Sequence, residues 1–192
     1  TASIRIFGRK AGEFMNRSRD KNEDKKMIQV NNVREESGEH VPKVSVIIPF
    51  HNAQSHLEEM MDSVEAQTFR EIEILCVSDG SEDDSIKIIR ERMEKDPRIH
   101  LIRWKKEFNY SAINNYGASF AKGEYLLLLN NDTEIINPDC LEELLGYCMR
   151  SDVGAVGARL YYEDDTIQHA GVVIGFGGIA GHCFVMQPRG TT

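Results

Sequence analysis

The sequence of 192 residues lacks the features that mark several large classes of protein. It has no apolar run of about 18 residues, the length that a membrane-spanning helix needs. Basic residues are in the minority, because 23 Lys and Arg stand against 31 Asp and Glu, for a formal net charge of −8. Such a chain is poorly suited to neutralising nucleic-acid phosphates. We therefore expect no membrane span and no nucleic-acid partner.

Cysteine is also sparse, with four residues at positions 76, 140, 148 and 183. No two of them form a C-x-x-C pair, which argues against a zinc ribbon or a thioredoxin-type site. Cys140 and Cys148 lie on one expected helix, about 12 Å apart along its axis, which is too far for a disulfide. We expect four reduced and mostly buried thiols.

Residues 1–42 differ in character from the rest of the chain. The first 40 residues carry nine Lys or Arg and seven Asp or Glu, and few aromatic residues. This composition predicts a charged linker or N-terminal tail. A basic arm that lies on a membrane surface is the alternative, which the interspersed acidic residues disfavour.

From residue 43 onward, strand-like and helix-like patterns alternate. Short apolar runs predict strands at 44–49, 72–77, 99–104, 125–129 and 153–156. Apolar residues at helical spacing predict helices between them, including 111–121 and 137–149. This alternation predicts an α/β fold with a mostly parallel central sheet and flanking helices, as in Rossmann-like domains.

Polar side chains follow three of the predicted strands, at 49–52, 78–81 and 130–133. In a parallel sheet, ligands bind beyond the carboxyl ends of the strands. Asp79 could accept a hydrogen bond from a base or a sugar, while Asp132 offers the hard oxygen ligand that Mg²⁺ or Mn²⁺ prefers. Taken singly, each motif also fits a helix cap or an Asx turn.

Together, these motifs resemble the family 2 glycosyltransferases, which have a GT-A fold. The matching stretches include VSVIIPFHN, EILCVSDGSEDDS, NNYGASFAKGEYLLLLNND and NPDCLEEL, within roughly residues 43–185. The resemblance implies that residues 43–192 form the nucleotide-sugar-binding part of such an enzyme. It also implies that the chain stops before the acceptor-binding half, with the catalytic base beyond Thr192. We therefore expect this piece alone to be inactive in sugar transfer.

The resemblance also implies the site residues. Asp79 would accept from the imide N–H of uracil or thymine, and Asp132 would bind Mn²⁺ or Mg²⁺. Three positions carry less charge than the family pattern, because Ser78 and Asn130 replace aspartate and Asn114 replaces an arginine near the diphosphate. The nucleotide-binding positions are Pro49, Phe50, His51, Asn52, Asp79, Ser81, Asn114, Asn130 and Asn131.

The reaction implied is metal-assisted transfer of a hexosyl or deoxyhexosyl group, with inversion, from a UDP- or dTDP-sugar to an acceptor hydroxyl. The setting implied is synthesis of a bacterial cell-surface polysaccharide. The acceptor is then a saccharide or a lipid-linked saccharide. The resemblance implies a cytoplasmic protein, peripheral at the inner face of the membrane if its acceptor is lipid-linked.

Two other classes of function remain open from the residues. The three charge-reducing departures favour a nucleotide-binding α/β module without transfer activity. The second class is an oxidoreductase that uses the glycine run at 175–180, which fits G-x-G-x-x-A. A dinucleotide site needs a long helix and a second strand after such a run, and neither is expected here, so we expect no nicotinamide binding. His169 and His182 could touch the sugar or the diphosphate, although a structural function is the simpler interpretation.

Overall fold

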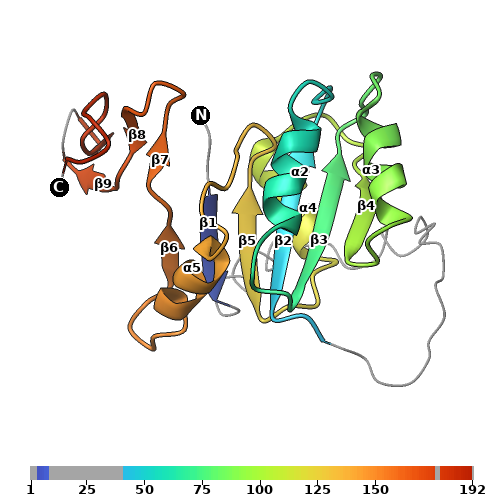
Figure 1. The fold of residues 1–192 in the computed structure, drawn as a ribbon, viewed down its shortest axis with the longest axis horizontal. Helices are drawn as coiled ribbons and strands as arrows, with labels where there is room; N and C mark the ends of the chain where they lie inside the picture. The colour runs from blue at the N-terminus through green and yellow to red at the C-terminus, as the bar shows by residue number, and fades with distance from the viewer. Residues whose placement is uncertain (1–3, 9–40, 176–177, 192) are drawn as a thin grey trace.

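A six-stranded sheet organises most of the computed structural model, which describes residues 4–8, 41–175 and 178–191 (Figure 1). Strands β2 to β5 are mutually parallel, whereas β1 pairs antiparallel with both β5 and β6. This arrangement confirms the predicted mostly parallel sheet. In spatial order the strands are β4 (Ile99–Arg103), β3 (Ile72–Ser78), β2 (Val44–Phe50), β5 (Tyr125–Leu129), β1 (Ile4–Gly8) and β6 (Ala155–Gly157).

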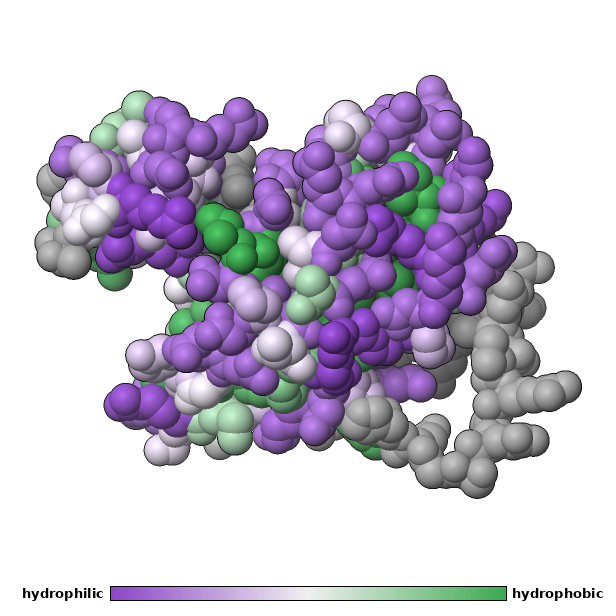
Figure 2. All heavy atoms as spheres, viewed as in Figure 1, coloured by the Kyte–Doolittle hydropathy of each residue, from purple (hydrophilic) through white to green (hydrophobic). Residues whose placement is uncertain are grey.

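Within the described part of the chain, four helices cover the two faces of this sheet. They are α2 (Leu57–Glu65), α3 (Ser85–Met93), α4 (Tyr110–Ala118) and α5 (Cys140–Cys148). Helices α2, α3 and α5 contribute to the larger apolar core, and α4 contributes to the smaller core on the opposite face (Figure 1). In α2 the buried residues recur every three or four positions, which gives the helix one apolar stripe. Hydrophilic residues cover most of the face on which α2 and α3 lie (Figure 2).

Strand β5 is buried along its whole length, as its continuous apolar run predicts. Leu127 and Leu129 point into the larger core, whereas Leu126 and Leu128 point towards α4. Alternation along the strand therefore supplies both cores at once. Because β5 lies in the middle of the sheet, the Asn130–Asp132 tripeptide that follows it lies near the middle of the sheet's carboxyl-end edge.

The N-terminal segment departs from the linker expected over residues 1–42. Residues 4–8 form β1, in which Ile4 and Ile6 are buried opposite Leu129 and Leu127. The pairing joins residues more than 100 positions apart, so no local sequence pattern predicts it. The rest of the expected linker, apart from residues 41–42, lies outside the described residues.

Strand β6 also differs from the expected fifth strand. It spans Ala155–Gly157 and pairs antiparallel with β1, so it joins the sheet through the N-terminal strand. Two hairpins follow it, β7 (Leu160–Tyr161) with β8 (Ile167–His169), and β9 (Val172–Ile174) with β10 (Ala180–His182). The expected glycine run at 175–180 lies between β9 and β10, which pair antiparallel, and its residues 176–177 lie outside the described residues. Among the described residues, no helix has the length and apolarity to cross a membrane.

Candidate functional site

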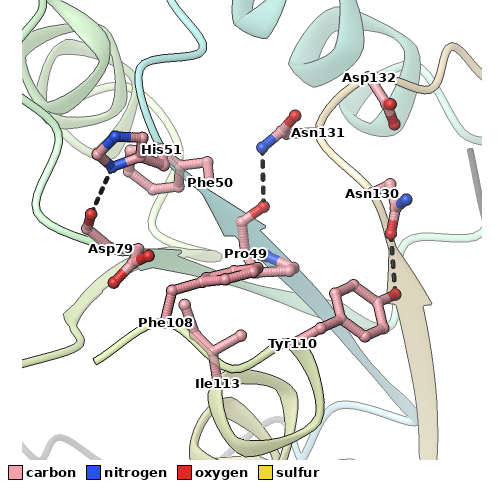
Figure 3. A pocket seen from close by; sticks show the side chains of 10 residues that line it. All are labelled: Pro49, Phe50, His51, Asp79, Phe108, Tyr110, Ile113, Asn130, Asn131 and Asp132. Carbon is pink, nitrogen blue, oxygen red and sulfur yellow. Dashed lines mark hydrogen bonds between the residues drawn. The ribbon is translucent and has the colours of Figure 1, made fainter. Parts of the chain in front are cut away.

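A cavity of about 230 Å³ opens at the carboxyl ends of β2, β3 and β5, beside the start of α4 (Figure 3). It brings together seven of the residues that the sequence predicts for a nucleotide and metal site. Asp79 and Asp132 line the same cavity, so the three strand ends do meet at one rim. The lining residues are Pro49, Phe50, His51, Asp79, Phe108, Tyr110, Ile113, Asn130, Asn131 and Asp132.

His51 ties the loop after β2 to the loop after β3. Its Nδ1 lies 2.6 Å from the carbonyl oxygen of Asp79, and its Nε2 lies 3.2 Å from the Nδ2 of Asn52. Because an amide nitrogen only donates, Nε2 must accept and the proton belongs on Nδ1, from which it is donated to Asp79. The imidazole thus fixes the backbone that carries the Asp79 carboxylate. Gly80, at a φ of +66°, allows the tight turn that follows.

Asn52 and Ser81 lie beside the cavity and brace its loops. The Asn52 backbone N–H donates to the Ser81 hydroxyl over 3.1 Å, and the Glu82 N–H donates to the Asn52 side chain over 2.9 Å. The neighbouring Asp83 carboxylate accepts from the backbone of Gln54 and of Ser85. Desolvation opposes ionisation of Asp83, yet hydrogen bonds with the Ser85 side chain and with these backbone groups hold its pKa below the usual value.

Asn114 lies beneath the cavity lining, on α4. Only 4% of its surface is exposed, and its Nδ2 donates to the carbonyl oxygen of Tyr110 over 2.8 Å. Its Oδ1 is buried and has no hydrogen-bond partner among the described residues. The site thus has a buried amide at the position where the family resemblance expects a guanidinium beside the diphosphate.

The Asn130–Asp132 tripeptide is held by side-chain hydrogen bonds from two directions (Figure 3). The Tyr110 phenol donates to the Oδ1 of Asn130 over 2.9 Å, and the Nδ2 of Asn131 donates to the Pro49 carbonyl oxygen over 3.0 Å. Asp132 is exposed at the cavity wall. This places its carboxylate within reach of a ligand in the cavity.

The donor set fits a weakly held divalent cation. Carboxylate and amide oxygens are the hard ligands that Mg²⁺ and Mn²⁺ prefer. Within the described ranges, no group of three or more His, Cys, Asp or Glu residues could hold a metal ion. A cation at Asp132 would therefore take most of its ligands from a bound diphosphate and from water.

Three residues of the cavity lining were not predicted from the sequence: Phe108, Tyr110 and Ile113. They reach the cavity because α4 packs closely on β2 and β3, at a point where Gly117 meets Ile47 and Val77. The available sequence signal was a pair of aromatic residues on either side of Asn109, which caps α4 by accepting from Ala112. Phe108 is 65% exposed, whereas phenylalanine side chains are most often buried in a protein core.

His169 and His182 pair with each other outside the cavity lining. Their Nδ1 atoms are 2.6 Å apart and their rings meet edge to face, which joins strand β8 to strand β10. Burial lowers the pKa of His169, and electrostatic interactions with His182 and Arg5 lower it further. The contact between the two rings fits the simpler, structural interpretation of these residues.

A mostly parallel sheet whose strand ends converge on one cavity is the architecture of the GT-A glycosyltransferases. The mannosyltransferase PcManGT from Pyrobaculum calidifontis, solved in complex with GDP-Man and Mn²⁺, superposes with a TM-score of 0.59. The superposition covers 65% of this chain and 37% of that one, at 23% sequence identity. At this identity the likeness establishes the fold.

Residues 45–173 match the glycosyl transferase family 2, and the chain belongs to this family. The O-antigen biosynthesis protein RfbC of Myxococcus xanthus is 45% identical over 150 residues, which are 78% of this chain and 12% of that protein. Glycosyltransferase GlyG of Streptococcus pneumoniae is 30% identical over 123 residues, which are 64% of this chain and 40% of GlyG. The chain thus spans less than half the length of either relative.

Proposed function

We propose that this domain binds a nucleoside diphosphate sugar in the cavity, as the donor-binding part of an enzyme that transfers the hexosyl or deoxyhexosyl group, with inversion, to an acceptor hydroxyl. The observation that carries the proposal is that Asp79 and the Asn130–Asp132 tripeptide line one cavity. The likeness to an O-antigen biosynthesis protein supports a function in bacterial cell-surface polysaccharide synthesis. The acceptor is then a saccharide or a lipid-linked saccharide, and a lipid-linked one would bring a cytoplasmic enzyme to the membrane surface.

The donor proposed is a UDP- or dTDP-sugar. The Asp79 carboxylate can only accept hydrogen bonds when it is ionised, and uracil and thymine each present one imide N–H to such an acceptor. Guanine also presents N–H donors on one edge. GDP is therefore the nucleotide that tests the pyrimidine preference most strictly.

Asp132 is the proposed metal ligand, and Mn²⁺ or Mg²⁺ is the ion. When bound, such a cation neutralises the diphosphate and stabilises it as a leaving group. The chain's own residues bind and orient: Asn130 and Asn131 present their amides at the cavity, and the loop that His51 fixes presents Asp79. Because the two carboxylates of the lining are both assigned to the donor, the proposed general base lies on the acceptor side, outside this cavity.

Nucleotide binding by the 192-residue chain tests this proposal directly. We expect UDP or dTDP to raise the melting temperature more with Mn²⁺ than without it, and GDP to raise it less. Asp132→Ala should remove the Mn²⁺ dependence, whereas Asp79→Ala should remove the preference for pyrimidines. Glu163→Ala, in the exposed turn between β7 and β8, is the matched control and should behave as the unmodified chain. Failure of all three nucleotides to bind at millimolar concentration would refute the proposal.

A nucleotide-binding module without transfer activity is the second candidate. It is favoured by Ser78, Asn114 and Asn130, three positions that carry less charge than the family pattern. This candidate predicts nucleotide binding with no release of sugar from the donor. Measuring donor consumption by the full-length protein, in the presence of a saccharide acceptor, separates the two candidates.

A further inference from the structure

The orientation of the Asn130 side chain decides what this residue can offer to a ligand. A carboxylate presents the same kind of oxygen whichever way its end is turned. An amide is asymmetric, because one end only accepts hydrogen bonds and the other end only donates them. An asparagine at this position therefore needs a neighbour that fixes the direction of its amide.

Tyr110 is placed to fix that direction. Its hydroxyl donates to the Oδ1 of Asn130 over 2.9 Å, and Figure 3 shows the amide nitrogen on the side away from the phenol. The next residue, Asn131, is held separately by the Pro49 carbonyl oxygen. The two amides of the tripeptide are thus oriented by different elements, and Tyr110 acts on the first one.

The phenol is itself presented from a firmly held position. Asn109 caps α4 by accepting from the Ala112 N–H over 2.9 Å, and the buried Asn114 donates to the carbonyl oxygen of Tyr110 over 2.8 Å. One turn further along, the helix touches β2 and β3 at Gly117. The backbone of Tyr110 is therefore restrained on both sides before the phenol reaches β5.

We propose that Tyr110 is a positioning residue for the nucleotide sugar. By occupying the carbonyl end of the Asn130 amide, its hydroxyl turns the N–H₂ end so that it donates to an oxygen of the bound nucleotide. This inference rests on the proposed function of the cavity. It assigns to Asn130 a donor function that an aspartate at the same position could not perform.

The test is a double-mutant cycle with Tyr110→Phe and Asn130→Ala, in which the Kd for UDP and for dTDP is measured by calorimetry with Mn²⁺. Loss of one hydrogen bond that positions a donor should raise the Kd about 5-fold. In the Asn130→Ala background, Tyr110→Phe should have no further effect, because the phenol acts through Asn130. Tyr147→Phe, at an exposed position of α5, is the matched control and should leave the Kd unchanged.

The outcomes separate this inference from the function on which it rests. A Kd that Tyr110→Phe changes less than about 2-fold, while Asp79→Ala still removes the preference for pyrimidine nucleotides, would overturn the inference and leave the proposed function standing. An equal loss in both backgrounds would mean that Tyr110 contacts the nucleotide directly, which also overturns the inference. Failure of the unmodified chain to bind either nucleotide would overturn both. The melting temperature of the free protein should be the same for Tyr110→Phe and Tyr147→Phe, which excludes a loss caused by misfolding.

Discussion

Two helical glycines test whether α4 is packed against the sheet as tightly as the structure shows. A Cβ at Gly117 would lie 2.7 Å from the Cγ2 of Ile47 and 3.0 Å from the Cγ2 of Val77. Both methyl groups belong to fully buried, β-branched side chains of β2 and β3, which have little rotational freedom. The Gly117→Ala variant must therefore move α4 away from the sheet.

Gly146 provides the matched control on α5. A Cβ at this exposed position would meet no atom within 4 Å. Both substitutions gain about 1 kcal/mol from the higher helix propensity of alanine. Gly117→Ala also pays for overpacking, at about 1–3 kcal/mol. The difference between the two variants removes the shared gain and isolates the steric cost.

Urea denaturation measures the free energy of unfolding of each variant. We expect Gly146→Ala to be more stable than the unmodified chain, and Gly117→Ala to be less stable than Gly146→Ala by about 1–3 kcal/mol. Nucleotide binding should weaken in Gly117→Ala alone, because α4 carries Tyr110 and Ile113 into the cavity. If Gly117→Ala is as stable as Gly146→Ala, the close packing of this helix is refuted.

Two further predictions concern buried and paired groups. Burial raises the pKa of Cys76 to about 12, so iodoacetamide at about pH 8 should label half-buried Cys183 well before Cys76; equal labelling by mass spectrometry would contradict the burial. The hydrogen bond from Arg98 holds the pKa of Asp96 below its usual value, so this pair stabilises the fold fully above about pH 4 and loses its effect as pH falls through the lowered pKa. Asp96→Asn should therefore be less stable than the unmodified chain in urea at neutral pH and approach it in acid, and a stability gap that does not change with pH would contradict this.

Much of the site could be predicted because its residues follow strands with strong local patterns. The run that forms β5 is apolar throughout, and that of β3 is apolar except for Glu73 and the final Ser78. A carboxylate follows each strand, as Asp79 after β3 and as Asp132 after β5. Parallel strands place such ends at one edge of a sheet. The convergence on one cavity therefore follows from chain order and strand direction.

The aromatic wall of the cavity could not be predicted in the same way. Tyr110 and Phe108 reach the cavity only because α4 lies across β2 and β3 at a distance that Gly117 permits. Neither the closeness of that packing nor the hydrogen bond from Tyr110 to Asn130 has a signature in local spacing. The same holds for Asn52 and Ser81, whose hydrogen bonds to neighbouring loops place them beside the cavity.

The sequence by itself determined the α/β class, the order of the parallel strands along the chain and the three polar strand ends, because periodicity and burial are local properties that a short window of residues carries. Only the tertiary structure decided that residues 4–8 enter the sheet between β5 and β6. That placement comes from a pairing of Ile4 and Ile6 with residues far along the chain. The β1 strand pairs with β5 because the folded sheet presents there a free edge and an apolar face. This edge and this face exist only once the other strands have assembled.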